Sequence, residues 1–251
     1  MALRKIFIPL LCFSFLFFCL PATDAVERDT TREIAAAQDR TRSVEDRSRT
    51  IMALGKSGDP RASAPLRRIL KDPAEPQRVR VSAVISLARI GEPRSEILSA
   101  CEAAYRGPKA GRNLRYALLL ALGDMKAVES LALLSEALTG KDDGIRFKAA
   151  QALGRIGEGD AVSILQSRFE VERDRMVRAE IIRALGRNES ASVEALLVRA
   201  LKTDPEPLVR YNAALSLLKF RSLGEAGREA LRDAGSDPSP MVRKTVREGG
   251  R

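Results

Sequence analysis

Histidine and tryptophan are absent from the 251-residue sequence, and aromatic residues make up only 4% of it. Without histidine, the chain can form no histidine-based catalytic triad and few of the zinc or iron sites found in proteins. We therefore expect a protein that is not an enzyme, with no catalytic residues, no metal site and no cofactor. Acidic residues are outnumbered by basic ones, and the formal net charge of +10 favours an anionic partner.

Cysteine is also scarce, and two of the three cysteines, Cys12 and Cys19, lie in an uncharged apolar run over residues 6–20. The basic opening MALRK precedes this run and the small residues of PATDA follow it, an order typical of a secretory signal peptide. The run is shorter than the ~20 residues that cross a bilayer. We predict that residues 1–25 are a signal peptide cleaved after Ala25, and that the protein is exported and either periplasmic or secreted. An uncleaved N-terminal membrane anchor is the alternative.

Cleavage at this position would leave Cys101 as the last cysteine, so no intramolecular disulfide could form. Cys101 lies at helical spacing from Ile97 and Leu98, and we expect it to be a small buried hydrophobe. The formal charge would become +9, with acidic and basic residues interleaved rather than grouped in blocks. Export argues against nucleic acid as the partner, which leaves an anionic envelope polymer or a membrane surface.

One short pattern recurs along the chain, an arginine followed seven residues later by leucine. The arginines are Arg47, Arg80, Arg115, Arg146, Arg178, Arg210 and Arg243, at intervals of 31 to 35 residues. The leucines are Leu54, Leu87, Leu122, Leu153, Leu185 and Leu217. Self-similarity at such a period is the mark of a repeat architecture. It predicts six full units and a closing stub over residues 43–251.

Each unit carries a second amphipathic segment, such as SAPLRRIL or VEALLVRAL, with apolar residues three and four apart. No segment has the pattern of a strand. Stacked helix pairs form an α-solenoid in which each unit contacts its neighbours, so we predict an all-α fold of this kind. Residues 26–42 are expected to be a polar N-terminal cap helix or a linker. The glycines that follow the recurring leucines, Gly55, Gly123, Gly154 and Gly186, are expected to be left-handed helix C-caps.

Residues 204–217, DPEPLVRYNAALSL, fit the pattern D-P-x-x-x-V-R-x-x-A-A-x-x-L and resemble HEAT-like repeats, including the group named after phycobilin lyases. The resemblance covers roughly residues 43–247 and implies the solenoid fold. It also implies that each recurring arginine binds an aspartate in a turn between helices and ties adjacent units together; we call these seven arginines the arginine ladder. The third unit departs from the pattern, because YRGPKAG is inserted and no Asp-Pro precedes Arg115.

The family mixes scaffolds with a few enzymes, and the sequence argues against each enzyme class. Its di-iron hydroxylases use His-Glu motifs, which a chain without histidine cannot contain. Nothing beyond the repeat indicates a phycobilin lyase. DNA glycosylases of this type trap bases with aromatic residues, and an exported chain without tryptophan is a poor match.

A possible binding surface follows from the helical wheel of the arginine-bearing helices. The positions one and five residues after the arginine lie opposite the core side, at ~100° per residue, yet they hold mostly apolar and aromatic side chains. We predict that they line the concave groove of the solenoid: Val81, Ile85, Tyr116, Leu120, Phe147, Gln151, Arg183, Tyr211 and Leu215. The alternative is that these side chains pack against neighbouring units, and full burial of the three aromatic residues would favour it.

Together these features predict a monomeric, non-catalytic interaction module or scaffold of the cell envelope, which binds a partner protein or peptide along its groove. The alternative is electrostatic binding to an anionic envelope polymer or membrane surface. Salt distinguishes the two, because ionic strength weakens charge pairing at a surface and leaves apolar contacts almost unchanged.

Overall fold

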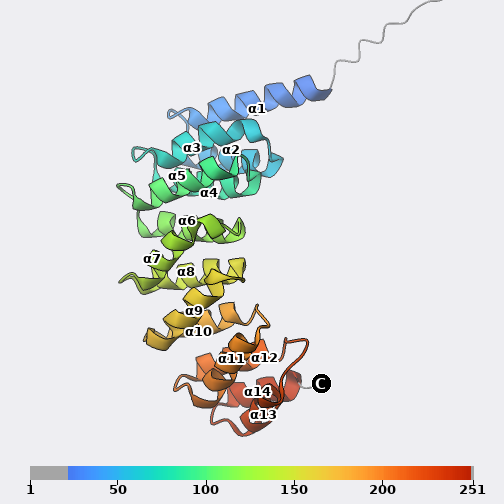
Figure 1. Ribbon diagram of the computed structural model, residues 1–251. Coiled ribbons are helices and arrows are strands. Elements are labelled where there is room, and N and C mark those ends of the chain that lie inside the picture. Colours follow the sequence, from blue (N-terminus) through green and yellow to red (C-terminus); the bar gives the residue numbers. More distant parts are fainter. Residues whose placement is uncertain (1–21, 250–251) are drawn as a thin grey trace, which may run out of the picture.

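A computed structural model describes residues 22–249, and these residues form a single column of helices with short connections (Figure 1). The first helices of successive pairs are α1 (Ala22–Gln38), α3 (Ser63–Lys71), α5 (Arg94–Arg106), α7 (Leu131–Thr139), α9 (Asp160–Val171), α11 (Ala191–Thr203) and α13 (Glu225–Asp233). The second helices are α2 (Val44–Ser57), α4 (Gln77–Ile90), α6 (Arg112–Asp124), α8 (Asp143–Ile156), α10 (Arg175–Leu185), α12 (Pro207–Leu217) and α14 (Pro240–Gly249). Three short 3-10 turns, η1 (Pro60–Ala62), η2 (Val128–Ser130) and η3 (Ala234–Ser236), flank α3, α7 and α13.

The predicted α-solenoid is confirmed, with the units divided differently. Because α1 packs on α2, the segment expected to be a cap or linker supplies the first helix of the first pair. The described residues therefore form seven helix pairs, α1–α2 to α13–α14, in place of six units and a stub. Most of the predicted signal peptide lies outside the described residues, and its expected cleavage position after Ala25 falls within α1.

The helices form two layers, and the second helices of each pair make the inner one. Successive second helices, from α2 to α14, pack closely on one another, whereas successive first helices touch much less. In a curved stack of two layers, successive helices lie closer together on the concave side than on the convex side. Because the second helices are the more closely packed, they line the concave face. Every recurring arginine lies on a second helix and therefore in this inner layer.

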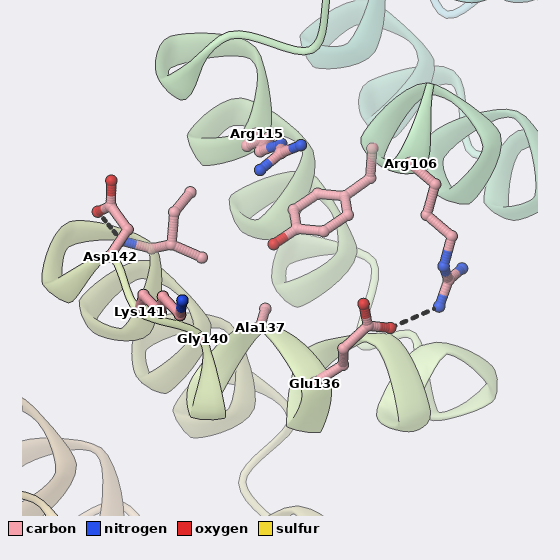
Figure 2. A pocket seen from close by; sticks show the side chains of 9 residues that line it. Arg106, Arg115, Glu136, Ala137, Gly140, Lys141 and Asp142 are labelled. Atoms are coloured by element: carbon pink, nitrogen blue, oxygen red, sulfur yellow. Dashed lines mark hydrogen bonds and ion pairs between the residues drawn. The ribbon is translucent and has the colours of Figure 1, made fainter. Parts of the chain in front are cut away.

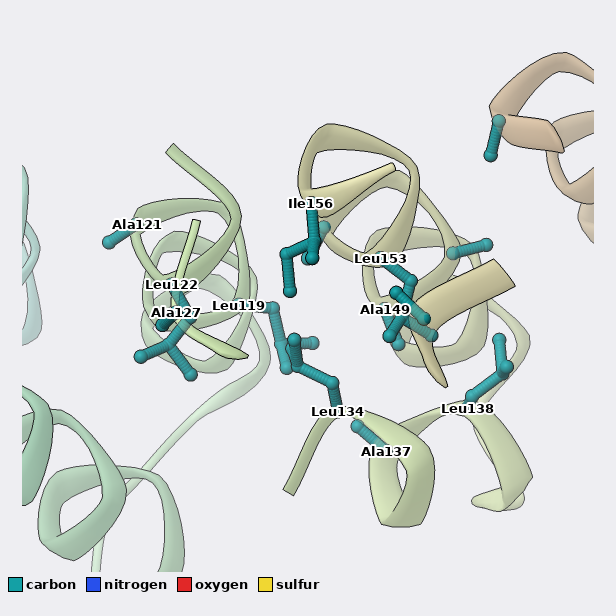
Figure 3. Close-up of a cluster of buried hydrophobic side chains, with 14 of the residues drawn as sticks. Leu119, Ala121, Leu122, Ala127, Leu134, Ala137, Leu138, Ala149, Leu153 and Ile156 are labelled. Atoms are coloured by element: carbon teal, nitrogen blue, oxygen red, sulfur yellow. The ribbon is translucent and has the colours of Figure 1, made fainter. Parts of the chain in front are cut away.

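The core lies between the two layers and follows the arginine–leucine register. All six recurring leucines are buried, as are the residues directly before the arginine, from Val79 to Val242. In the middle of the column, Leu119 of α6 points towards Leu134 of α7 (Figure 3), and Leu122 of α6 and Leu153 of α8 belong to the same core cluster. Full burial of such a side chain stabilises the fold by about 1.5–3 kcal/mol, so the repeat pattern marks the residues that hold the units together. Cys101 is part of this core, and burial raises the pKa of its thiol to about 12.

The prediction for the four recurring glycines is wrong. The left-handed glycines at the ends of second helices are Gly58, Gly91 and Gly157. Gly55, Gly123 and Gly154 lie inside their helices, and Gly186 has a φ of −62°. These four lie where one second helix crosses the next, each opposite a small residue: Ser86, Ala152, Ala184 and Ser216. A Cβ atom at Gly123 would lie 2.7 Å from Cα of Ala152, so glycine is needed for close approach of the helices.

Candidate functional site

The nine predicted groove residues all lie on second helices, in α4, α6, α8, α10 and α12, and so in the concave layer. Arg183 is exposed, and the other eight are partly buried. The three aromatic residues, Tyr116, Phe147 and Tyr211, pack with one side against the core and keep part of the ring accessible. The concave layer therefore carries a row of half-buried apolar side chains.

A lysine lies between the two aromatic residues at the centre of this row. The ammonium group of Lys148 lies 5.4 Å from the ring centroid of Phe147 and 6.0 Å from that of Tyr116. It also donates a hydrogen bond of 3.0 Å to Oε1 of Gln151. The hydroxyl of Tyr116 packs so closely on Gly144 that a Cβ atom there would lie 1.8 Å from it. The central part of this row is therefore ordered by its own contacts and combines apolar, aromatic and cationic groups.

Towards the C-terminus, the inner layer carries a charged pair. Arg183 donates two hydrogen bonds to the carboxylate of Glu180, one of them 2.8 Å from Nε to Oε2. This pairing raises the pKa of Arg183, while partial burial opposes it. Glu180 is buried, and its charge is compensated by Arg183. Arg183 is the member of the pair that faces solvent.

Four arginines of the ladder join successive units through a carboxylate. The pairs are Arg47–Glu75 at 2.8 Å, Arg146–Glu172 at 2.9 Å, Arg178–Asp204, and Arg210–Asp237 at 2.8 Å. In each pair the carboxylate belongs to the turn that precedes the next second helix, and its side chain is almost completely buried. Buried ionic hydrogen bonds of this kind fix one geometry between neighbours.

Arginines of the ladder also bind the turn of their own unit. Nη1 of Arg210 donates to the carbonyl of Asp204 at 2.9 Å, and Nη1 of Arg243 donates to the carbonyl of Asp237 at 2.7 Å. The acidic residue of an inter-helix turn therefore accepts hydrogen bonds from two arginines. Its backbone carbonyl binds the arginine of the same unit, and its side-chain carboxylate binds the arginine of the preceding unit. Four of the seven arginines thus tie adjacent units together as the resemblance implied, two through the expected aspartate and two through a glutamate.

Burial alone would raise the pKa of Glu172, but its hydrogen bonds outweigh this effect. Donors from Arg146, the backbone of Asp174 and Arg168 together lower the pKa to about 2. The carboxylate is therefore ionised at all but strongly acidic pH, and the link between α8 and α10 is ionic under ordinary conditions.

Three predicted members of the ladder have no carboxylate partner within residues 29–249: Arg243 in the last described helix, and Arg80 and Arg115, where the ladder is interrupted at the third unit. Arg80 is buried and donates to the carbonyls of Leu70 at 2.9 Å and Lys109 at 3.3 Å. Burial lowers its pKa, and the charge of Asp72 opposes this. Arg115 is exposed and makes no side-chain hydrogen bond or ion pair within residues 29–249; its guanidinium lies 5.4 Å from the ring centroid of Tyr105. The prediction that Arg115 forms a link is thus wrong.

The reason lies in the turn of the next unit. The position six residues before the ladder arginine holds Glu172, Asp204 and Asp237 in the last three units. The same position holds Lys109 before Arg115, and Gly140 before Arg146. Neither residue has a carboxylate to offer the preceding arginine.

A pocket of about 510 Å³ lies beside Arg115, between the α5–α6 pair and the α7–α8 pair. Figure 2 shows Arg115 of α6 on one side and Gly140 and Lys141 of the next turn on the other. The remaining lining residues are Tyr105, Arg106, Glu136, Ala137, Asp142 and Ile145. Sequence reasoning missed this pocket, although the insertion in the third unit marked its neighbourhood.

A family model for HEAT repeats matches residues 32–101, 108–185 and 170–249. The chain belongs to the HEAT-repeat family. The complex of CpcE and CpcF of phycocyanin lyase from Nostoc sp. PCC7120 has a similar fold, with a TM-score of 0.53, 18% identity, and coverage of 88% of this chain and 93% of that one. Human deoxyhypusine hydroxylase in complex with glycerol is also similar, with a TM-score of 0.41, 19% identity, and coverage of 90% and 96%. No curated protein sequence matches the chain.

At 18% identity the phycocyanin lyase structure supports the fold of this HEAT-repeat protein and nothing finer. HEAT-repeat solenoids commonly serve as scaffolds for protein interaction, and the relatives also include enzymes. Within residues 22–249 there is no group of three or more metal-binding side chains. In the same part of the chain, no helix combines the length and the hydropathy that crossing a bilayer requires.

Proposed function

We propose that this HEAT-repeat protein is a non-catalytic scaffold of the cell envelope that binds a segment of a partner protein along its concave face. One observation carries the proposal, the row of half-buried apolar and aromatic side chains on the inner layer from α4 to α12. Helices packed about 8–10 Å apart make this face roughly 40 Å long. An extended segment of about 12 residues spans that length.

The composition of the groove supports a polypeptide as the partner. Aromatic rings next to cationic groups, as at Phe147 and Lys148, are common anchors of protein interfaces. The side chains are held in place by contacts with the core, so they lose little conformational freedom on binding. The envelope location rests on the N-terminal sequence alone and is part of the proposal.

The second candidate is electrostatic binding to an anionic envelope polymer or membrane surface. The net charge of +10 favours it. Against it, acidic and basic residues are interleaved along the chain rather than grouped in blocks, and arginines on the surface lie beside acidic partners, such as Arg94 with Glu129 and Arg112 with Asp142. We therefore favour the protein partner.

A capture experiment from envelope extract, at moderate and at high salt, tests the two candidates. The variant Tyr116→Ala/Phe147→Ala/Tyr211→Ala removes the aromatic groups of the groove. A matched control, Val128→Ala/Val171→Ala, removes exposed apolar groups away from the inner layer. We expect a protein that the parent and the control retain at high salt and that the folded groove variant loses. Capture that disappears at high salt and is the same for all three proteins would contradict the groove and support the electrostatic candidate.

A further inference from the structure

The turns of the intact links provide a template for the pocket beside Arg115. Glu172 and Asp204 occupy the residue that follows α9 and α11, and each places its carboxylate against the arginine of the preceding unit. Gly140 occupies the same place after α7. Its φ and ψ of −64° and 166° fall in the same extended region as the −71° and 135° of Glu172. The backbone is thus arranged for a link, and the carboxylate is the part that the sequence does not supply.

The charges around the pocket leave two cations without a partner. Glu136 accepts a hydrogen bond of 2.9 Å from Arg106, and Asp142 accepts bonds of 2.6 and 2.9 Å from Arg112. Both acidic groups that face the pocket are therefore compensated. Arg115 and Lys141 have no ion pair within residues 29–249 and give the pocket a net positive charge.

The remaining walls suit an acid with an aliphatic stem. Ala137 and Ile145 are buried and offer methyl groups to the pocket. Tyr105 is buried with a hydroxyl that makes no hydrogen bond within residues 29–249. Burial raises the pKa of Tyr105 while the nearby Arg115 opposes this, so the hydroxyl keeps its proton and can donate it. The pocket combines cations, a hydroxyl donor and an apolar surface.

We propose that this pocket binds the carboxylate of an acidic side chain of the partner protein, in the place that Glu172 and Asp204 fill at the intact links. Arg115 directly precedes Tyr116 on α6, so the pocket adjoins the groove and one bound segment can reach both. That the ligand is part of a protein rests on the proposed function. That the pocket binds a carboxylate rests on its lining residues alone. The partner would complete in trans the interrupted arginine ladder.

The first test supplies the carboxylate within the chain. A Cβ atom at Gly140 would lie 3.4 Å from the nearest atom, the carbonyl of Ala137, so a side chain fits there. We expect Gly140→Glu to raise Tm by about 2–4 °C relative to the neutral control Gly140→Gln, the shift that one additional ionic hydrogen bond produces in a chain of this size. The gain should vanish in the Arg115→Gln background. Equal Tm values for the two Gly140 variants, or a gain that persists without Arg115, would overturn the proposal.

The second test measures binding of a small carboxylate by NMR. N-acetyl-glutamate α-amide should shift the side-chain Nε–H signal of Arg115 and the amide signal of Lys141 in a saturable manner, and N-acetyl-glutamine α-amide should not. Arg115→Gln should weaken binding at least about tenfold, as expected for loss of a charged hydrogen bond. Gly140→Glu should block it. Tighter binding of inorganic phosphate than of the glutamate derivative would overturn the assignment to an acidic side chain.

The capture experiment separates this proposal from the proposed function. A partner that is lost by the groove variant but retained by Arg115→Gln, with no NMR shifts from the glutamate derivative, would leave the scaffold function standing and remove the pocket from it. Specific NMR shifts without any captured protein would support the pocket chemistry and contradict the protein partner.

Discussion

The guanidinium of Arg146 binds both oxygens of the Glu172 carboxylate, at 2.9 Å from Nε and 3.2 Å from Nη2, across the boundary between two units. The glutamate side chain is only 2% exposed, so solvent screens this contact very little. Arg168 binds the same carboxylate from the preceding helix. A single buried carboxylate thus holds together the end of α9 and the start of α8, and its energetic effect can be measured.

Glu172→Gln should lower the free energy of unfolding by about 3–5 kcal/mol, because it leaves two guanidinium groups without their counter-charge in a largely buried place. Urea denaturation measures this loss. Glu189→Gln is the matched control, since Glu189 pairs with an Arg221 side chain that is 92% exposed; it should cost less than about 1 kcal/mol. Similar losses for the two variants would show that burial of the link contributes nothing.

The Glu172 link should also depend on pH. The pKa of this carboxyl is about 2 in the folded protein, against an ordinary value of 4.5. A carboxyl whose pKa is lower in the folded than in the unfolded protein stabilises the fold at pH values above the unfolded-state pKa. This contribution is lost as pH falls from about 5 to about 2. The difference in unfolding free energy between the parent and Glu172→Gln should therefore be constant at ~3 kcal/mol from pH 5 to 7 and shrink steadily below pH 4.5. A difference that does not change down to pH 2.5 would contradict this.

Close packing of the second helices predicts the effect of a methyl group at their crossing point. Gly123→Ala should destabilise the protein by about 1–3 kcal/mol, although alanine is the better helix former, because its Cβ would overlap Cα of Ala152. Gly235→Ala is the control, since a Cβ atom there has no neighbour within 4 Å. Thermal unfolding of the two variants gives the comparison, and a stabilised Gly123→Ala would refute close approach at this crossing.

The thiol of Cys101 should be unreactive in the folded protein. Burial raises its pKa to about 12, so the thiolate that reacts with alkylating agents is scarcely formed at pH 8. Iodoacetamide labelling followed by peptide mass spectrometry should leave Cys101 unmodified in native buffer and fully modified in urea. Rapid labelling under native conditions would show that α5 opens locally.

The sequence predicted the helices and the core well, because both follow from the arginine–leucine pattern that recurs every 31 to 35 residues. The leucine seven residues after each ladder arginine must face the other layer, wherever the units lie in space. The glycines were misinterpreted because their role depends on how closely two second helices cross. That distance is set by the register between Gly123 and Ala152, residues far apart in the sequence.

The groove and the pocket were less accessible to sequence reasoning. Whether Tyr116 or Phe147 is exposed depends on the curvature of the stack, which no single repeat encodes. The interruption at Arg115 did have a signal in the sequence, the glycine at position 140 where later units have an acidic residue. It could be interpreted only after the structure showed that each arginine binds the turn of the following unit.

The interrupted ladder also leaves the middle of the described column without buried ion pairs between its units. On the C-terminal side of the pocket every boundary from α8 to α12 is joined by a buried ionic link, and α2 and α4 are joined in the same way at the other end. At the α6–α8 boundary the inner helices pack closely while α5 and α7 scarcely touch, so the packing of the inner layer holds this boundary together. The buried ion pair is thus missing at two successive boundaries, α4–α6 and α6–α8, although Arg80 still donates to the carbonyl of Lys109 across the first of them. A carboxylate bound at Arg115 would therefore make the ionic link of the α6–α8 boundary depend on the partner protein.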